Sequence, residues 1–373
     1  MKILHISKKY KNALGGDSVV VGNLEAQQLA RGHEVIVLSS NCDEIIGDER
    51  HYKFGLPATA AALDNISLPR LVSLGALFFK TFAVLRKERP DVVHTHSIDM
   101  AFIASFAARW FKIPIVHTFH ILTFPDANQD ALRRKTELFF TRGARAQVVT
   151  SPNQNDVDHL KRVGVKNARF MSNGIDLAFW KNEKKTSHDV FTFITAARLE
   201  RQKGIEYLIR AAAELKNVGG PFKLVIVGEG SLEEELKALA KELSVYEDIE
   251  FVGRKTPAEV RDLYALSDVV VLPSLWEAAP LAMFEAWAME LPLVITNVGM
   301  FASEVDDKAY AKIVEAGDSY ALAKAMEEVL TDAKKRQDMI TAGNEVVQNY
   351  TWAAVANIAD DLYAEARGKA GKS

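Results

Sequence analysis

The hydrophobic and polar positions of the chain form short apolar runs that alternate with longer segments of mixed character. Short apolar runs rich in β-branched residues predict buried strands, and apolar residues spaced three to four apart predict helices. The predicted strands are 2–6, 34–40, 91–96, 114–120, 146–151, 191–196, 222–228, 249–253, 268–274 and 291–296. The predicted helices are 18–31, 69–88, 98–111, 204–217, 231–243, 257–266 and 280–289.

Strands that alternate with helices predict parallel sheets covered by helices on both faces, and the alternation runs through the chain in two series. We therefore expect an α/β protein of two doubly wound, Rossmann-like domains that face each other across a cleft. The first would span 1–178 and the second 179–351, with the polar stretch 179–190 at the seam. A final amphipathic helix, about 352–373, is expected to pack back on the first domain.

The helix boundaries have local causes in the sequence. Asp17 and Ser18 are side chains that cap helix starts, and Pro257 and Pro280 suit first helical turns. In open α/β sheets, ligands bind beyond the carboxyl ends of the strands. The loops that follow the predicted strands are therefore the places to look for chemistry.

Composition narrows the class of protein. The 373 residues are 48% hydrophobic and 25% charged, as in ordinary soluble proteins, and suit two domains. Cys42 is the only cysteine, which excludes an intrachain disulfide or a cysteine zinc site. The charged start does not resemble a signal peptide, and no apolar run is long enough to span a membrane. We expect a cytoplasmic protein.

The charges are distributed unevenly along the chain. Residues 1–176 hold 23 Lys and Arg against 17 Asp and Glu, whereas the remainder holds 23 against 32. A basic half favours an anionic partner, either a phosphorylated acceptor or an anionic membrane surface, and ordinary surface charge explains it equally well. The basic residues beside apolar helix 69–88 fit a protein that is peripheral on the inner face of a membrane, and a core helix with solvated ends fits them as well. They are Arg70, Lys80, Arg86, Lys87 and Arg89, with a second group at 133–135.

Four histidines follow or end two neighbouring strands: His94, His96, His117 and His120. We interpret His94 and His117 as hydrogen-bonded residues of the interior. His120 stands at the end of its strand, where this architecture places function. A histidine metal site is an alternative, but the sequence offers no paired carboxylates at a convincing spacing.

Two loops carry groups suited to phosphate. Gly15 and Gly16 precede a helix, so their amides suit an anion, although most such pairs are turns. Arg198 and Lys203 flank the loop after strand 191–196, and two cations on one loop suggest a diphosphate; a solvated turn is the plainer interpretation of that loop alone. Gly228 opens a segment that lacks the third glycine of a dinucleotide fingerprint, since Glu233 stands there.

Glu277 and Glu285 bracket the segment WEAAPLAMFEAWA. Glu277 is expected in the loop after strand 268–274 and Glu285 within the following helix, whose first amides lie near Ala279, Pro280 and Leu281. Carboxylates accept hydrogen bonds from sugar hydroxyls, and amides and cations hold phosphates. The set describes a sugar–diphosphate–ribose ligand, while two ordinary helix-start charges remain an alternative.

These features in order resemble the retaining nucleotide-sugar glycosyltransferases of family 4, which have the GT-B fold. The resemblance runs nearly end to end. The segments that carry it are the first-loop GG, ARGHEVIVLSS, DVVHTH, PIVHTFH, SNGID, ARLERQKGIEYLI, KLVIVGEGS, IEFVGR and the glutamate pair.

The resemblance implies a role for each matching residue. Glu285 would bind the ribose, Glu277 the donor sugar, and Arg198 and Lys203 the diphosphate, with His120 beside the anomeric carbon. The other donor-site residues would be Gly15, Gly16, Asn173, Gly174, Gly228, Arg254, Ala279, Pro280 and Leu281. Two departures concern the sugar and phosphate contact: Met300 replaces a usual glycine, and Glu304 comes late.

The implied reaction moves a hexosyl unit from a UDP- or GDP-sugar to a hydroxyl acceptor, with retention at the anomeric carbon. The products implied are glycolipids, cell-surface polysaccharides or small glycosides, so the acceptor includes anionic and lipid-linked molecules. No metal or other cofactor is expected, and nucleic acid is not an expected partner. A sugar-nucleotide epimerase or phosphorylase on the same fold, and a non-catalytic sugar-nucleotide-binding module, are the alternatives.

Overall fold

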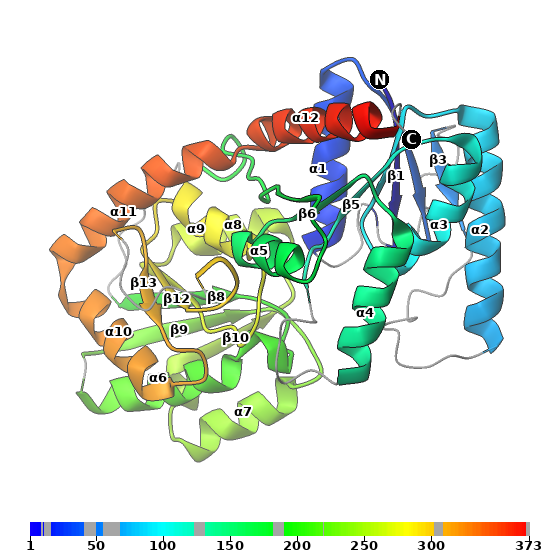
Figure 1. Cartoon of the computed structure of the whole chain (residues 1–373). Coiled ribbons are helices and arrows are strands. Elements are labelled where there is room, and N and C mark those ends of the chain that lie inside the picture. Colours follow the sequence, from blue (N-terminus) through cyan, green and yellow to red (C-terminus); the bar gives the residue numbers. More distant parts are fainter. Residues whose placement is uncertain are drawn as a thin grey trace. The chain divides into compact units, whose positions relative to one another are not determined.

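The computed structural model describes residues 1–8, 10, 16–40, 50–54, 68–122, 131–181, 190–218, 220–301 and 309–370. The chain divides into two compact units. The first unit comprises Met1–Asn173 and Trp352–Ser373, and the second comprises Gly174–Thr351 (Figure 1). Each unit is an α/β structure with its own sheet.

The first unit is built on a seven-stranded sheet in the order β3-β2-β1-β4-β5-β6-β7, with every described pairing parallel. The strands are β1 (Lys2–Ser7), β2 (Glu34–Ser39), β3 (His51–Lys53), β4 (Val92–Thr95), β5 (Ile115–Thr118), β6 (Val148–Ser151) and β7 (Ala168–Phe170). Its helices are α1 (Gly16–Ala30), α2 (Leu68–Glu88), α3 (Ile98–Phe111), α4 (Ala131–Ala144), α5 (Gln154–Arg162) and α12 (Trp352–Ala370).

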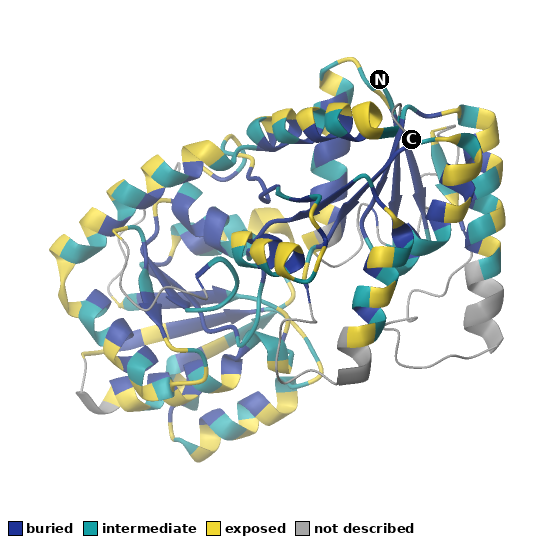
Figure 2. Ribbon diagram, in the orientation of Figure 1, coloured by how far each residue is buried: buried dark blue, intermediate teal, exposed yellow. Residues whose placement is uncertain are grey.

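The central strands of this sheet are buried along their lengths, which is what a parallel sheet with two covered faces requires (Figure 2). The helix α12, the last of the chain, packs beside α1 and against β4, β5 and β6. Its Tyr363 is fully buried. Residues from the far end of the sequence therefore complete the interior of the first unit.

The second unit is built on a six-stranded parallel sheet in the order β10-β9-β8-β11-β12-β13. The strands are β8 (Phe191–Ala196), β9 (Phe222–Val227), β10 (Ile249–Gly253), β11 (Val269–Leu272), β12 (Leu293–Thr296) and β13 (Lys312–Val314). Its α-helices are α6 (Ile205–Val218), α7 (Glu233–Glu242), α8 (Pro257–Ala265), α9 (Leu281–Ala288), α10 (Ser319–Thr331) and α11 (Ala333–Val347).

Both sheets reverse their strand order once, between β1 and β4 in the first unit and between β8 and β11 in the second. At such a reversal the two central strands send their connections to opposite sides, so their exit loops part and leave room for a ligand. The loops after these four strands are therefore the positions that the fold favours for binding.

Every strand and helix predicted from the hydrophobic pattern is present, and the expectation of two doubly wound domains is confirmed for each unit. Two local expectations were wrong. Helix α1 begins at Gly16, before the expected caps Asp17 and Ser18. Pro280 is the N-cap of α9 rather than a residue of its first turn.

Candidate active site

The exit loops of β8 and β11 bring two predicted site residues together. The Lys203 ammonium forms an ion pair with the Glu277 carboxylate, and the side chains are 18% and 8% exposed. A carboxylate this deeply placed would be costly without a partner, and the lysine supplies one. An ammonium has three donor hydrogens, so Lys203 retains donors for a phosphate while it is bound to Glu277.

Main-chain contacts hold these two loops in register. Residues Arg201–Lys203 form a single 3-10 turn, which ends at Gly204 with a φ of 62°. A Cβ atom at Gly204 would lie 2.0 Å from the Pro273 carbonyl oxygen, so only glycine permits this close approach. The amide of Leu275 donates to the Gln202 carbonyl over 2.8 Å, and the Gln202 side chain donates to the Trp276 carbonyl over 3.0 Å. These contacts fix where Lys203 meets Glu277.

Arg198 lies on the same loop and is exposed, with its guanidinium 3.4 Å from the Gln202 amide oxygen. Gly228, after β9, packs on the backbone of this loop: a Cβ there would lie 1.9 Å from the Ala197 carbonyl oxygen. The glycine is needed for packing beneath Arg198. The structure therefore places two cations, Arg198 and Lys203, on one loop with a buttressed backbone.

Arg254 follows β10, the edge strand, and its guanidinium is 3.8 Å from the Glu229 carboxylate, with both side chains about half exposed. It lies at the same carboxyl end of the sheet, because all the strands are parallel. Ala279 is buried, while Pro280 and Leu281 at the start of α9 are partly exposed. The helix follows directly on the loop that carries Glu277.

Glu285 lies in α9, on the fifth residue of the helix. Burial raises the pKa of its carboxyl to about 8, although the residue keeps some surface exposure. Tyr264 is fully buried nearby; burial and then the charge of Glu285 raise the pKa of its phenol. A carboxyl in this setting is protonated at neutral pH and gains its charge only when a ligand or a higher pH stabilises the anion.

Met300 lies in the turn Gly299–Phe301, whose backbone packs on the Glu277 loop: the Met300 amide donates to the Ala278 carbonyl over 3.0 Å. Met300, which stands where a glycine is usual, therefore packs against the loop that carries Glu277. Glu304, the second departure, lies outside the described residues.

In the first unit, His120 follows β5 and is partly exposed, with its Nε2 3.2 Å from Nδ1 of His96. Gly16 is the exposed first residue of α1, and Asn173 is buried at the end of the unit. Gly174 is the first residue of the second unit. Gly15 lies outside the described residues.

The interpretation of His94 and His117 as bonded interior residues is confirmed. His94 bonds to Tyr363 and Thr118 over 2.7 Å each, and the Nδ1 of His117 lies 3.0 Å from the Thr95 hydroxyl. Burial lowers the pKa of His117 to about 3, so its ring is neutral.

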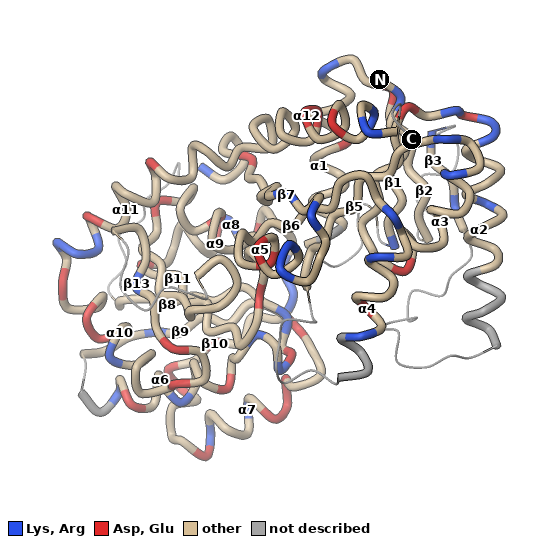
Figure 3. The backbone as a smooth tube through the Cα atoms, viewed as in Figure 1, with Lys and Arg blue, Asp and Glu red and all other residues tan. Residues whose placement is uncertain are grey.

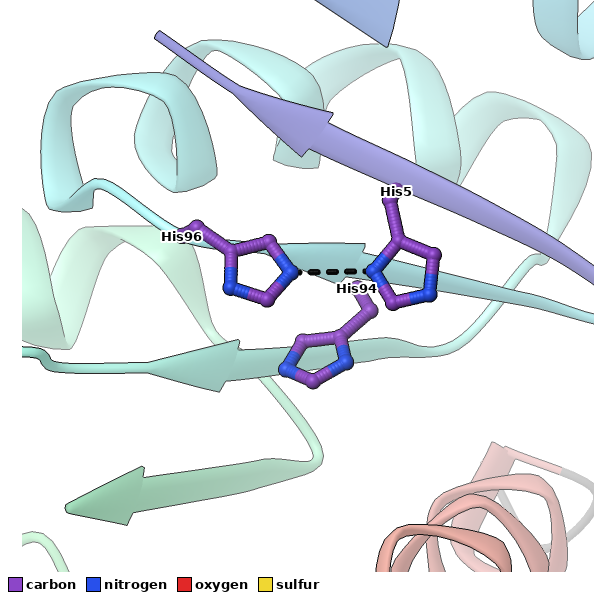
Figure 4. Close-up of side chains that lie close together, drawn as sticks. All are labelled: His5, His94 and His96. Atoms are coloured by element: carbon purple, nitrogen blue, oxygen red, sulfur yellow. Dashed lines mark hydrogen bonds between the residues drawn. The ribbon is translucent and has the colours of Figure 1, made fainter. Parts of the chain in front are cut away.

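Three imidazoles of the first unit lie close enough to be considered as metal ligands. His5 from β1, His94 from β4 and His96 after β4 are buried, and one ligand nitrogen from each lies within 4.8 Å of the others (Figure 4). Sequence reasoning missed His5, which stands in the interior of a strand. The alternation of side chains along β1 and its pairing with β4 were the signals that would have placed it beside His94.

Comparison with known proteins shows which family of proteins this chain resembles. The model for Glycosyltransferase Family 4 matches residues 14–179, and the model for Glycosyl transferases group 1 matches residues 177–346. The glycogen synthase of Mycobacterium tuberculosis is 27% identical over 395 residues, which cover 98% of this chain and 95% of that protein.

Two further proteins extend the comparison. The UDP-Gal:alpha-D-GlcNAc-diphosphoundecaprenol alpha-1,3-galactosyltransferase of Escherichia coli is 27% identical over 319 residues, covering 80% of this chain and 81% of that protein. The sucrose-phosphate synthase of Thermosynechococcus elongatus has the same fold, with a TM-score of 0.82 and 22% identity over 98% of both chains.

Two Rossmann-like units, each with one reversal of strand order, make up the GT-B fold, and the two matched family models make this chain a glycosyltransferase. The chain belongs to the family 4 type of these enzymes, as the two matched models together show. Among the described helices, none combines the length and the apolar character needed to cross a membrane.

Proposed function

We propose that this enzyme transfers a hexosyl unit from a UDP- or GDP-sugar to a hydroxyl acceptor, with retention at the anomeric carbon. The observation that carries the proposal is the Lys203–Glu277 pair at the reversal of the second sheet, with Arg198 on the same loop. Cations for a diphosphate and a carboxylate for sugar hydroxyls stand together there. The similarity to a galactosyltransferase whose name specifies UDP-Gal supports a nucleotide-sugar donor.

Each site residue has a chemical role in this proposal. Lys203 and Arg198 bind the diphosphate and stabilise its charge as it leaves. Glu277 accepts hydrogen bonds from the donor sugar, and Glu285 accepts them from the ribose. His120 contacts the donor sugar. The remaining donor contacts come from Gly15, Gly16, Asn173, Gly174, Gly228, Arg254, Ala279, Pro280 and Leu281.

The reaction breaks the bond between the anomeric carbon and the diphosphate oxygen and forms one from that carbon to the acceptor oxygen. The acceptor loses its hydroxyl proton, and the departing diphosphate, on the same face of the sugar, takes it. Arg198 and Lys203 supply two positive charges to the diphosphate, so the proposal needs no metal ion.

The acceptor that we propose is anionic or lipid-linked, and the first unit carries a surface suited to an anionic membrane. Phe79 on α2, Phe106 and Trp110 on α3, and Phe139 on α4 are 72%, 47%, 76% and 64% exposed, and we call these four residues the aromatic surface. Lys and Arg residues lie along the same helices (Figure 3). Exposed rings flanked by cations are typical of surfaces that bind anionic lipid.

Half-buried rings support members of the aromatic surface from beneath. The half-buried ring of Phe82 lies 6.3 Å from Trp110, and that of Phe102 lies 5.2 Å from Phe106 and 6.0 Å from Phe139. The Arg109 guanidinium lies 4.9 Å from the centre of the Phe106 ring. The side chains of Arg70, Arg133 and Arg134 lie outside the described residues.

The proposal is tested by calorimetric titration with UDP, GDP, ADP and NAD and then with UDP- and GDP-sugars, without metal. Selective binding of UDP or GDP, followed by transfer to a hydroxyl acceptor whose product keeps the anomeric configuration, is expected. Binding of none of them by folded protein contradicts the proposal. Productive use of water or phosphate as acceptor would instead indicate the epimerase or phosphorylase alternative.

A further inference from the structure

His120 is the outer end of a chain of hydrogen bonds that runs into the centre of the first unit. Its Nε2 lies 3.2 Å from Nδ1 of His96, Nε2 of His96 lies 2.9 Å from Nδ1 of His5, and Nε2 of His5 lies 2.8 Å from the Gln28 amide oxygen. A neutral imidazole has one N–H and one acceptor nitrogen. The direction of any one of these bonds therefore fixes the direction of the others.

The chain continues through α12. The Gln28 amide nitrogen donates to the Tyr363 hydroxyl over 3.0 Å, and that hydroxyl lies 2.7 Å from Nδ1 of His94. Nε2 of His94 lies 2.7 Å from the Thr118 hydroxyl. Burial lowers the pKa of His5 and holds those of His94 and His96 well below the usual range, so each ring carries a single proton.

The inner end of the chain sets its direction. The Thr118 and Thr150 hydroxyls are 2.6 Å apart, and the Thr150 hydroxyl donates to the main-chain carbonyl of His117 over 3.5 Å, the longest link. A carbonyl only accepts. With Thr150 donating to it, Thr118 donates to Thr150, His94 donates to Thr118, and Tyr363 donates to His94. The amide of Gln28 then presents its oxygen to His5.

We infer that Gln28, His5 and His96 are positioning residues that fix His120 in the tautomer with its proton on Nε2 and its lone pair on Nδ1. While His120 is neutral, any group that hydrogen-bonds to this Nδ1 must be a donor. A sugar hydroxyl meets that requirement, and a phosphate oxygen does not. The step from tautomer to sugar contact rests on the role proposed for His120; the tautomer itself does not.

The arrangement is a tautomer lock rather than a path for proton transfer. Its inner end is a peptide carbonyl, which takes up no proton at neutral pH. A metal ion on His5, His94 and His96 is the competing explanation of their proximity. All six of their ring nitrogens already have partners, and each lone pair accepts a hydrogen bond. Figure 4 shows one of these bonds, between His96 and His5. A metal would have to displace at least three of these bonds.

The test is NMR of the full-length, ligand-free protein labelled with ¹⁵N-histidine. Two-bond ¹H–¹⁵N correlations identify the protonated nitrogen, and ¹⁵N–¹⁵N couplings across hydrogen bonds identify the bonded pairs. We expect protons on Nε2 of His120, His96, His5 and His94, with couplings for His120–His96 and His96–His5. A proton on Nδ1 of His120 overturns the inference.

Gln28→Glu makes the prediction sharper. The new carboxylate still accepts from His5, so His5, His96 and His120 keep their tautomers. It accepts from Tyr363 as well, so that hydroxyl must receive a bond from His94, whose proton moves to Nδ1. We therefore expect the tautomer of His94 to reverse while that of His120 stays the same. An unchanged His94 tautomer contradicts the proposed chain of hydrogen bonds.

His5→Phe interrupts the chain, and His117→Phe is the matched control, since His117 is also a buried histidine but lies outside the chain of rings. The first variant is expected to give a mixture of His120 tautomers and to lower kcat by roughly 10- to 100-fold, as small misplacements of reacting groups do. The control changes neither. If His5→Phe gives a mixture of His120 tautomers but an unchanged kcat, the inference about the tautomer stands. The proposed contact of His120 with the sugar is then refuted. Histidine resonances that shift on addition of Zn²⁺ at one equivalent would favour the metal site and overturn the inference.

Discussion

Lys203 and Glu277 form an ion pair across the two loops that leave β8 and β11, the strands between which the second sheet reverses its order. The pair joins a residue proposed to hold the diphosphate to one proposed to hold the sugar. In the protein without ligand, each neutralises the other. In the proposed complex, the remaining donor hydrogens of Lys203 serve the diphosphate and the remaining acceptor positions of Glu277 serve the sugar hydroxyls.

Replacing either cation of this loop is expected to slow the reaction. Lys203→Ala or Arg198→Ala removes a preorganised charge at the leaving group, which typically costs about 100- to 1,000-fold in kcat. Lys216→Ala is the matched control, because Lys216 is also ion-paired in the second unit, to Asp248, and lies at the end of α6. Steady-state kinetics decide: a folded Lys203→Ala enzyme with near-normal kcat would refute the role.

Glu285 is expected to make the stability of the free protein depend on pH. Its pKa is about 8 in the folded protein and near 4.5 when unfolded, so the folded state binds more protons between those values. The free energy of unfolding therefore falls as pH rises from about 4.5 to 8 and stays low above it. Denaturant unfolding across this range measures the slope.

Glu285→Gln should remove that slope, raise stability above pH about 8, and weaken donor binding, because the ribose loses a carboxylate acceptor. Glu290→Gln, at an exposed residue just after α9, is the control and should change neither. A Glu285→Gln protein with wild-type donor affinity by calorimetry would show that the carboxyl does not bind the ribose.

Metal chelation is expected to leave activity intact. In the proposed reaction, Arg198 and Lys203 provide the positive charge that a divalent ion would otherwise bring to the diphosphate. The measurement is the initial rate before and after EDTA treatment and dialysis. Loss of activity that Mn²⁺ or Mg²⁺ restores would show that the reaction needs a metal.

Gly204→Ala is expected to destabilise the second unit more than the same substitution at Gly253, another glycine with a positive φ. Both Gly204 and Gly253 have positive φ values, 62° and 69°, and alanine there costs roughly 1–2 kcal/mol. At Gly204 the added Cβ would also lie 2.0 Å from the Pro273 carbonyl oxygen, whereas at Gly253 nothing lies within 4 Å. If Gly204→Ala and Gly253→Ala lower the free energy of unfolding equally, the close packing of Gly204 on Pro273 is contradicted.

The aromatic surface is expected to bind anionic vesicles. Trp110→Ala together with Phe139→Ala should reduce co-sedimentation with phosphatidylserine vesicles at low salt, and added salt should weaken binding of the wild type. Tyr320→Ala removes a ring that is 63% exposed in the second unit and should have no effect. Wild-type protein that stays in the supernatant at low salt would contradict the membrane proposal.

The elements that the sequence predicted share long apolar runs or a clear helical period, and three missed strands and the missed helix α5 lack both. Strands β3, β7 and β13 have three residues each and lie at the edges of the sheets, where one neighbour suffices and no alternation develops. Helix α5 buries only Asp156, Val157 and Leu160, too few for a recognisable stripe. The helices α4, α10 and α11 were also missed, although α10 buries Leu322, Ala323, Ala325, Met326 and Val329 at helical spacing.

The placement of a candidate residue was predictable where it lies in the loop after a strand. Arg198, Lys203 and Glu277 were expected at one edge of the sheet because parallel strands bring their exit loops there. The contact of Lys203 with Glu277 depends on how two loops pack, and the Gly204–Pro273 approach that sets it leaves no mark beyond a single glycine. The sequence could not predict the chain of hydrogen bonds from His120, because Gln28, His5 and Tyr363 come from three elements that meet only in the folded unit.

The packing of α12 also bears on how the protein is made. Tyr363 and its helix belong to the first unit, yet the ribosome synthesises them after the whole of the second. The second unit is one continuous stretch and can fold as soon as it emerges. The first unit must wait, with the place of α12 open, until α12 has been synthesised, and it is therefore completed after the second unit and is the more exposed to misfolding or chaperone capture in the meantime.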